Sequence, residues 1–388
     1  MDKALENKIL FRLPHRRVPL TMKTLALLCF GLVALAAPSQ TTLQPADLAA
    51  NAFFGFSISA DGNLLAVGAP QFRTNTNINP GSVYIFQRTG GGTWVQQAKL
   101  QSPTPMFTDQ FGMSVALQGN TLLVGAPKAN TTGRVFEFRL ANGAWQHQAT
   151  LLPEPNDILF GATLAFHRNA LAIGSGAINT SSVYTVTRNQ STWSAPSRIQ
   201  LANVLSFGGA LAIQDDTMVI GAPHSNAAFI YTRSNGVWSQ TTALAPVNNS
   251  LYGWSVAINN GRIAVGAPLG NQGGAAYVYR QVNGNWSPSF RLDALSAGGF
   301  GGENFAQGVA LSATTLAVGA PSARWFATYT LNADTWTPLA RQDNATGSFQ
   351  ALYGQNIALP DNNTTIVASP GWSSETEQLK GAVYITQK

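Results

Sequence analysis

Seven copies of one short motif constrain the fold of this chain more than any other feature. An aromatic residue, usually followed by glycine, recurs at intervals of 45 to 57 residues, at Phe54, Phe111, Phe160, Phe207, Tyr252, Phe305 and Tyr353. A second landmark, VGAP or a close variant, follows each copy, at 67–70, 124–127, 173–176, 220–223, 265–268, 318–321 and 367–370. Between the two landmarks lie two apolar runs around a turn rich in Gly and Asn, which is typical of a β-hairpin. A supersecondary unit repeated at this period indicates a repeat architecture.

Each repeat contains two further predicted strands. A third alternating run, such as VYIF at 83–86, follows the second landmark, and a Trp then opens a fourth strand in six repeats: Trp94, Trp145, Trp193, Trp238, Trp286 and Trp336. Four antiparallel strands per repeat predict an all-β, seven-bladed β-propeller. The seventh repeat ends without a fourth strand, so we expect residues 39–48 to complete that blade and close the ring. The periodic Trp residues are expected to wedge between blades.

The recurring F-G-x-S-V-A and V-G-A-P pair resembles the FG-GAP repeat of the integrin α-subunit propeller, over about residues 40–388. The resemblance implies an extracellular binding or adhesion module that recognises a protein or a glycan through loops on one face. It also leaves open a lectin with sugar pockets between blades and a hydrolase or enzyme-associated scaffold. Calcium-binding members carry an Asp-rich loop in the first hairpin of a repeat, and no hairpin here supplies three spaced carboxylates. Because calcium needs several hard oxygen ligands, we expect no metal and no other cofactor.

The first 36 residues have the pattern of a secretory signal peptide, with a possible true start at Met22. A Lys, an apolar run from Leu25 to Leu35 and a small-residue cleavage site follow one another in order. We therefore expect residues 37–388 to form a single mature domain that is secreted, periplasmic or at the cell surface, without stable membrane insertion. The formal net charge is +6, but residues 1–36 hold six Lys or Arg against two acids. The remainder lacks the dense basic patch that nucleic-acid binding requires, so no nucleic-acid partner is expected.

Residues with catalytic chemistry are sparse in the mature chain. His147, His167 and His224 lie in different repeats, and no HExxH or G-x-S-x-G motif occurs. The adjacent Asp215 and Asp216 lie in a hairpin and are expected to face apart or into water. The sequence therefore predicts a binding protein rather than an enzyme, and we expect a monomer.

Two blades have unusually long connections between their second and third strands, 71–82 in the first repeat and 371–381 in the seventh. Ring closure would make these blades neighbours, and long loops on a rigid scaffold are where binding residues concentrate. Non-periodic Trp residues also follow the second landmark in the last two repeats. We therefore predict a ligand-binding patch of Arg73, Asn77, Trp325, Trp372, Glu375 and Lys380. The alternative is that the long loops are tolerated insertions without a binding role, and that each Trp only covers its own loop. Trp254 opens a first strand and is expected to pack.

Overall fold

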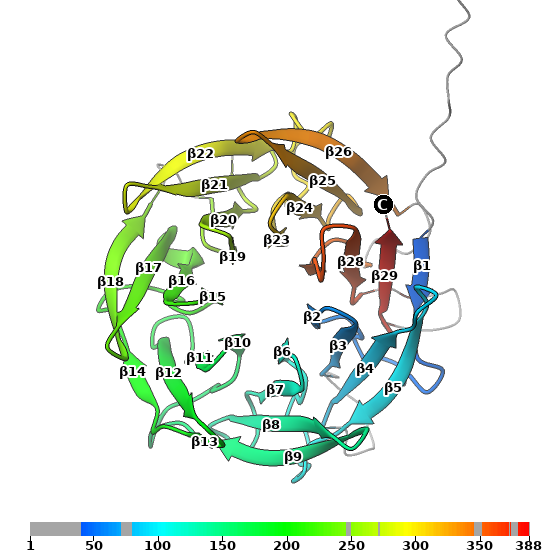
Figure 1. Cartoon of the computed structure of the whole chain (residues 1–388), viewed down its shortest axis with the longest axis vertical. Coiled ribbons are helices and arrows are strands. Elements are labelled where there is room, and N and C mark those ends of the chain that lie inside the picture. The colour runs from blue at the N-terminus through cyan, green and yellow to red at the C-terminus, as the bar shows by residue number, and fades with distance from the viewer. Residues whose placement is uncertain are drawn as a thin grey trace, which may run out of the picture. The chain divides into compact units, whose positions relative to one another are not determined.

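The computed structural model describes residues 40–70, 80–245, 250–270, 272–344, 351–371, 373 and 379–387. These residues belong to one compact unit, Pro38–Lys388. The described part contains seven antiparallel sheets arranged as a ring, and its one helical element is the short 3-10 helix η1 (Pro223–Ser225) (Figure 1). The all-β, seven-bladed propeller predicted from the repeats is confirmed. The predicted signal peptide, residues 1–36, lies outside the described residues.

Each blade runs outward from an inner strand next to the ring axis to an outer strand at the rim (Figure 1). Blade 1 consists of β2 (Ser57–Asp61), β3 (Leu64–Ala69), β4 (Ser82–Arg88) and β5 (Trp94–Leu100). Blade 2 consists of β6 (Ser114–Gln118), β7 (Thr121–Ala126), β8 (Arg134–Ala141) and β9 (Ala144–Leu151). Blade 3 consists of β10 (Thr163–His167), β11 (Ala170–Ser175), β12 (Ser182–Asn189) and an outer strand split into β13 (Thr192–Trp193) and β14 (Ser197–Ile199).

The next three blades repeat this plan. Blade 4 consists of β15 (Ala210–Gln214), β16 (Thr217–Ala222), β17 (Ala227–Ser234) and β18 (Val237–Leu244). Blade 5 consists of β19 (Ser255–Asn259), β20 (Arg262–Ala267), β21 (Ala275–Val282) and β22 (Asn285–Asp293). Blade 6 consists of β23 (Val309–Leu311), β24 (Thr315–Ala320), β25 (Trp325–Asn332) and β26 (Thr335–Asp343).

Blade 7 combines strands from both ends of the ring unit. Its three inner strands are β27 (Ile357–Ala358), β28 (Thr364–Ser369) and β29 (Ala382–Gln387). Its outer strand is β1 (Gln40–Leu43), which pairs antiparallel with β29 from Gln40 opposite Thr386 to Leu43 opposite Val383. This pairing satisfies the backbone groups that β29 would otherwise leave open at the rim.

The core lies between adjacent blades and is built from the repeated aromatic residues. Phe111, for example, is fully buried and packs its ring 5.7 Å from Phe136 and 6.0 Å from Phe138. The six periodic Trp residues all belong to, or pack against, the apolar clusters that join neighbouring blades. The prediction that they wedge between blades is confirmed.

The aromatic residue of each repeat and the residue after it, glycine in six repeats and Ala306 in the sixth, form a tight turn that presses on the blade before it. In blade 2, the Met113 N–H donates to the Gln110 carbonyl over 3.0 Å, and Gly112 has a φ of 90°, as the third position of a type II turn requires. The carbonyl of Gly112 points at Gly68 of blade 1, where an added Cβ would lie only 2.0 Å from that oxygen. The hydroxyl of Ser57 donates to the same carbonyl over 2.8 Å. The two sequence landmarks are therefore the two halves of one contact between blades.

Candidate functional site

The two ends of the ring carry different kinds of connection. We call the end with the links from second to third strands and from one blade to the next the loop face. The opposite end, where the first and second strands and the third and fourth strands are joined, is the hairpin face. The predicted binding patch is expected at the loop face, because its residues follow second strands in the sequence.

Four residues of the predicted patch, Arg73, Asn77, Trp372 and Glu375, lie outside the described residues. Lys380 is half-buried, and its carbonyl accepts a hydrogen bond from the Phe54 N–H over 2.9 Å. This bond places Lys380 beside the turn that enters blade 1. Whether the predicted patch binds a ligand stays a prediction.

Trp325 is buried rather than exposed. It is the first residue of β25, so it does not lie in a loop, and its side chain is 0% exposed. Its ring stacks on Phe305 with centroids 5.2 Å apart, and the Arg341 guanidinium lies 4.3 Å from the ring centroid. The prediction that Trp325 offers an exposed ring to a ligand is wrong, because these two side chains cover it.

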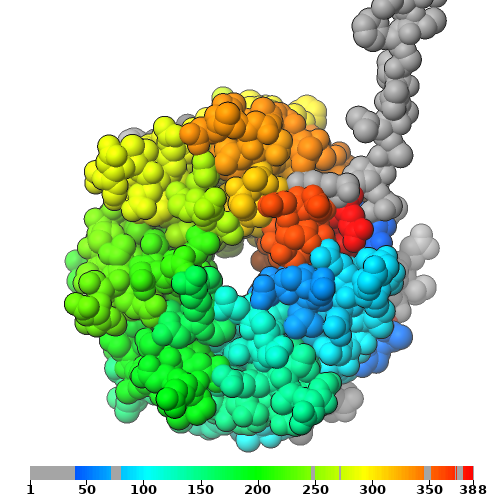
Figure 2. All heavy atoms as spheres, in the orientation of Figure 1, coloured from blue at the N-terminus to red at the C-terminus, as the bar shows by residue number. Residues whose placement is uncertain are grey.

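A cavity of about 580 Å³ opens where the ring axis meets the inner strands' first residues. The space-filling view shows a hollow through the centre of the ring (Figure 2). One residue from each blade, the one directly after the aromatic-glycine turn, lines this cavity. We call this set the mouth ring: Phe56, Met113, Ala162, Gly209, Trp254, Gln307 and Gln355.

The turn explains why these side chains lie at the channel. In every blade the N–H of the mouth-ring residue closes the turn on the carbonyl three residues earlier, as Trp254 does on Leu251 over 3.1 Å. The residue before it, glycine in six blades and Ala306 in blade 6, is held against the neighbouring blade, so the mouth-ring side chain is free to vary. Trp254 is 38% exposed, and the expectation that it packs in the core is wrong. Its position in the repeat, between the glycine and the Ser that begins the strand, was the signal that could have identified it.

Two residues further along each inner strand lies a second set of channel side chains. Side chains at i and i+2 share one face of a strand, so this set forms the next layer down. We call it the aliphatic ring: Ile58, Val115, Leu164, Leu211, Val256, Val309 and Ile357. The same residues also line a smaller cavity of about 290 Å³ in the middle of the channel.

The polar groups near Trp254 include a serine and histidine pair. Ser206 Oγ and His224 Nδ1 lie 2.8 Å apart, and His224 belongs to η1. Both residues line the same cavity, and the described residues that line it include no Asp, Glu, Lys or Arg. None of the described lining residues therefore supplies the carboxylate that orients the imidazole in a serine-histidine-aspartate triad.

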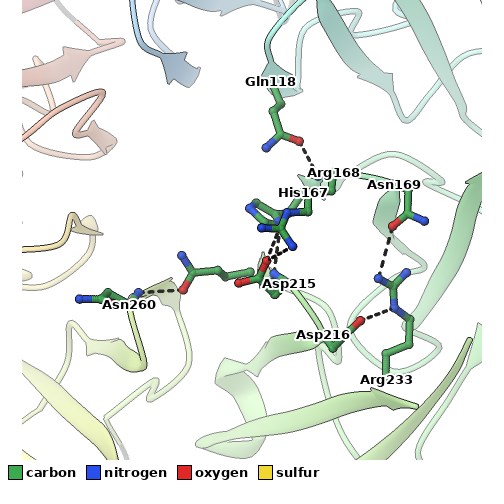
Figure 3. Close-up of polar contacts among 9 residues, drawn as sticks. Gln118, His167, Arg168, Asn169, Asp215, Asp216, Arg233 and Asn260 are labelled. Atoms are coloured by element: carbon green, nitrogen blue, oxygen red, sulfur yellow. Dashed lines mark hydrogen bonds and ion pairs between the residues drawn. The ribbon is translucent and has the colours of Figure 1, made fainter. Parts of the chain in front are cut away.

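At the hairpin face the blades are joined by side chains (Figure 3). The N–H of Arg168 donates to Gln118 Oε1, that of Asp215 to His167 Nδ1 over 2.9 Å, and that of Asn260 to Gln214 Oε1 over 2.7 Å. Each contact joins the first hairpin of one blade to that of the next.

Charged side chains reinforce this end of the ring. Asp215 pairs with Arg168 at 2.7 Å, whereas Asp216 pairs with Arg233 at 2.8 Å (Figure 3). The two neighbouring carboxylates therefore face apart, as expected, each toward its own arginine. Burial is the main cause that lowers the pKa of His167 below its ordinary value, and the nearby Asp215 carboxylate opposes that shift.

The described residues include no group of three or more His, Cys, Asp or Glu placed to hold a metal ion. In that same part of the chain, no helix has the length and apolar character needed to cross a membrane.

Comparison with known proteins identifies the repeat. The family model described as FG-GAP repeat matches residues 38–86, 94–137 and 238–279. No curated protein matches the chain. The chain is similar in structure to a solved protein from Lactobacillus plantarum, with a TM-score of 0.51 and 12% sequence identity. The alignment covers 74% of this chain and 84% of that protein's chain. At that identity the likeness concerns the fold alone.

Proposed function

This chain is an FG-GAP repeat β-propeller, and from that premise we propose that it is a binding module that holds a partner macromolecule, protein or glycan, on its loop face. A propeller is a rigid scaffold, and its fold alone does not select a ligand. The choice of face and of a binding role therefore rests on side chains.

The observation that carries the proposal is the distribution of exposed apolar side chains. Of the fourteen large apolar residues that are exposed in the described part of the chain, ten lie in loop-face connections: Met106, Phe107, Leu152, Ile158, Ile178, Leu205, Trp254, Leu269, Leu295 and Phe300. The other four lie in outer strands or at hairpin ends: Val95, Val237, Val282 and Leu339. Phe300 is 75% exposed and Phe107 is 56% exposed. Exposed apolar residues gathered on one face are a mark of an interaction surface.

We propose a non-catalytic role at a location outside the cytoplasm. The Ser206 and His224 pair has no orienting carboxylate among the described residues of its cavity. The signal-peptide pattern of residues 1–36 supports export. N-terminal sequencing of protein recovered from the medium or the cell surface tests the location, with cleavage after Ala36 as the expected result.

The binding role is tested with purified protein and intact cells of the source organism, either untreated, protease-treated or periodate-treated. Protease removes a protein partner, and periodate oxidises a glycan. The double substitution Phe107→Ser with Phe300→Ser should lower cell binding at least tenfold. The matched control, Val237→Ser with Val282→Ser, removes exposed apolar side chains from the hairpin ends and should leave binding unchanged. Equal loss in both variants, or loss in neither, would contradict the proposal.

A lectin with sugar sites between blades is the second candidate function. A groove of about 660 Å³ between β18 of blade 4 and the outer strands of blade 5 favours it. Trp286, Tyr277 and Arg291 line this groove, and they offer aromatic faces and donors that suit a sugar ring. If this is the function, a glycan array should give specific hits that Trp286→Ala abolishes and that the Phe107→Ser with Phe300→Ser variant keeps.

A further inference from the structure

A cavity lies at the hairpin-face end of the ring, and the proposed function makes no use of it. Its volume is about 390 Å³, which is within the range of small-molecule sites. The polar residues that line it lie at or near the ends of inner strands in five consecutive blades: Ser59, Asp61, Gln118, His167, Gln214 and Asn259. The cavity is therefore bordered by side chains that also join the blades.

Four of these side chains hold neighbouring blades together through an acceptor atom. Asp61 Oδ2 accepts the Gly119 N–H over 2.6 Å. Gln118 Oε1, His167 Nδ1 and Gln214 Oε1 each accept a backbone N–H of the next blade. Since a backbone N–H only donates, each amide must present its oxygen to the neighbouring blade, and the imidazole must present an unprotonated Nδ1. These contacts therefore fix which atom of each side chain is occupied.

The same contacts leave the donor groups of three side chains available to a ligand. In Gln118 and Gln214, the side-chain amide nitrogen makes no hydrogen bond within the described part of the chain. His167 must carry its proton on Nε2, because Nδ1 is an acceptor, and Nε2 has no hydrogen-bond partner among the described residues. Figure 3 shows the Gln118 amide nitrogen pointing away from Arg168, toward the open centre of the ring. Three successive blades therefore offer N–H groups to the cavity.

Asp61 adds a charged acceptor beside these donors. Only its Oδ2 is engaged, so Oδ1 is without a hydrogen-bond partner among the described residues. Asp61 is also the one acid among the described residues of the lining. A hydroxyl group donates to a carboxylate and accepts from an N–H at the same time, and hydrogen bonds to charged groups are the stronger ones. Neighbouring hydroxyl groups of one ligand therefore match a carboxylate followed by three N–H donors.

The rest of the lining is apolar and selects against charged ligands. Apolar side chains next to the polar ones on the inner strands also line the cavity: Ala60, Leu117, Phe166, Ile213, Ile258 and Leu359. They suit the C–H face of a sugar ring. An anion would lie near the Asp61 carboxylate, and a cation would meet N–H donors, so either would lose hydration without full compensation. We propose that this end of the channel binds one uncharged sugar ring, independently of the loop face.

Titration followed at the histidine rings tests the site directly. Protein labelled with nitrogen-15 receives the methyl glycosides of glucose, galactose, mannose and N-acetylglucosamine, and in parallel glucuronate and sulfate. At least one methyl glycoside should shift the His167 Nε2 resonance, assigned by its absence in His167→Gln, with a dissociation constant of about 1 mM. His147, on an outer strand, and His224, which lines the loop-face cavity, are internal controls and should not shift. A shift at His224 alone, tighter binding of glucuronate or sulfate, or no shift with any probe would overturn the inference.

Matched substitutions at two carboxylates separate a ligand contact from a structural one. Asp61→Asn keeps an oxygen for the Gly119 N–H but loses the charge, so the affinity for the bound glycoside should fall about tenfold while the melting temperature stays close to that of the parent. Asp216→Asn, on the same face but outside the cavity lining, should leave the affinity unchanged. Unchanged affinity in Asp61→Asn, or equal losses in both variants, would contradict the inference.

The loop-face variant separates this inference from the proposed function. Phe107→Ser with Phe300→Ser should bind the glycoside as the parent does, even where it loses cell binding. If that variant loses both, the glycoside does not have a site of its own at the hairpin face and this inference fails. If it keeps both, the proposed function fails and the sugar site stands.

Discussion

At the loop face, a backbone turn of one blade packs against a glycine of its neighbour and accepts a Ser or Thr hydroxyl, whereas at the hairpin face the blades meet through longer side chains. The loop-face contact consists of a turn carbonyl set against a glycine, as Gly161 is set against Gly125. The hairpin-face contact consists of side chains such as Gln118 and His167 that accept backbone N–H groups of the next blade. A backbone contact leaves side chains available for other uses, and a side-chain contact occupies one of their polar atoms. The loop face can therefore vary its side chains while the ring stays closed.

The largest expected effect comes from the side-chain network on the hairpin side. Glu137 is 0% exposed, and it accepts hydrogen bonds from Arg188 over 2.6 Å and from the Trp193 indole over 2.8 Å. Glu137→Ala leaves the Arg188 guanidinium buried without its partner, so unfolding free energy should fall by about 4 kcal/mol. Chemical denaturation measures the change. Asp216 provides the control, because its carboxylate is 65% exposed where it pairs with Arg233, and Asp216→Ala should cost no more than about 1 kcal/mol. Similar costs for the two substitutions would break the distinction between buried and exposed networks.

The backbone contact of the loop face should be nearly as sensitive. A Cβ on Gly125 would lie 2.0 Å from the Gly161 carbonyl oxygen, so Gly125→Ala must push two blades apart. We expect a loss of about 3 kcal/mol in unfolding free energy, which is the upper part of the range for overpacking. Gly119, in a hairpin of the same blade, has a φ of 53° and open space around its Cβ position. Gly119→Ala should therefore cost only the left-handed backbone strain, about 1 kcal/mol. Equal losses of unfolding free energy in the two variants would show that both glycines are needed for their backbone conformation and not for contact between blades.

Removing exposed apolar side chains should change the apolar surface that the protein presents to solvent, and should hardly change its free energy of unfolding. The change in apolar surface should be larger at the loop face than at the hairpin face. Phe107→Ser with Phe300→Ser removes two side chains that lie outside the core, so unfolding free energy should change by no more than about 0.5 kcal/mol. Retention on a hydrophobic interaction column should nevertheless shorten clearly. Val237→Ser with Val282→Ser should shorten it less, because these residues are not part of a face rich in apolar side chains. A larger change in retention time for the Val variant would mean that the main apolar surface lies at the hairpin face, contrary to our proposal.

The repeats predicted the fold well because the same physical contact recurs in every blade. The aromatic turn and the VGAP-like segment recur wherever two blades meet, with alanine replacing glycine at Ala306 and at Ala368, so their positions alone implied seven blades. The periodic Trp residues were assigned correctly for the same reason, since each fills the same space between blades.

The candidate site was predicted less well, because its residues are those that the repeat does not fix. Trp254 directly precedes a predicted first strand, as a core residue could. Only the turn geometry shows that its side chain lines the channel. Trp325 was placed in a loop because it follows the second landmark, but in blade 6 the connection ends at Arg324 and the strand starts at Trp325. The burial of Trp325 depends on Phe305 and Arg341, which are distant in sequence.

The smallest expected effect concerns pH at the hairpin face. His167 Nδ1 accepts the Asp215 N–H over 2.9 Å, and this bond requires an unprotonated Nδ1. Because the pKa of His167 is lower in the folded chain than its ordinary value of 6.5, the unfolded chain binds the proton more readily. The contribution of His167 is therefore fully present above pH 6.5 and is lost as the pH falls through 6.5 toward the folded pKa. His167→Gln offers the same kind of acceptor that Gln118 and Gln214 use in neighbouring blades, without the titration. Thermal unfolding at pH 8.0 and pH 5.5 should show a slightly smaller loss of melting temperature for the variant, and an identical loss in both proteins would mean that the imidazole does not report on this contact.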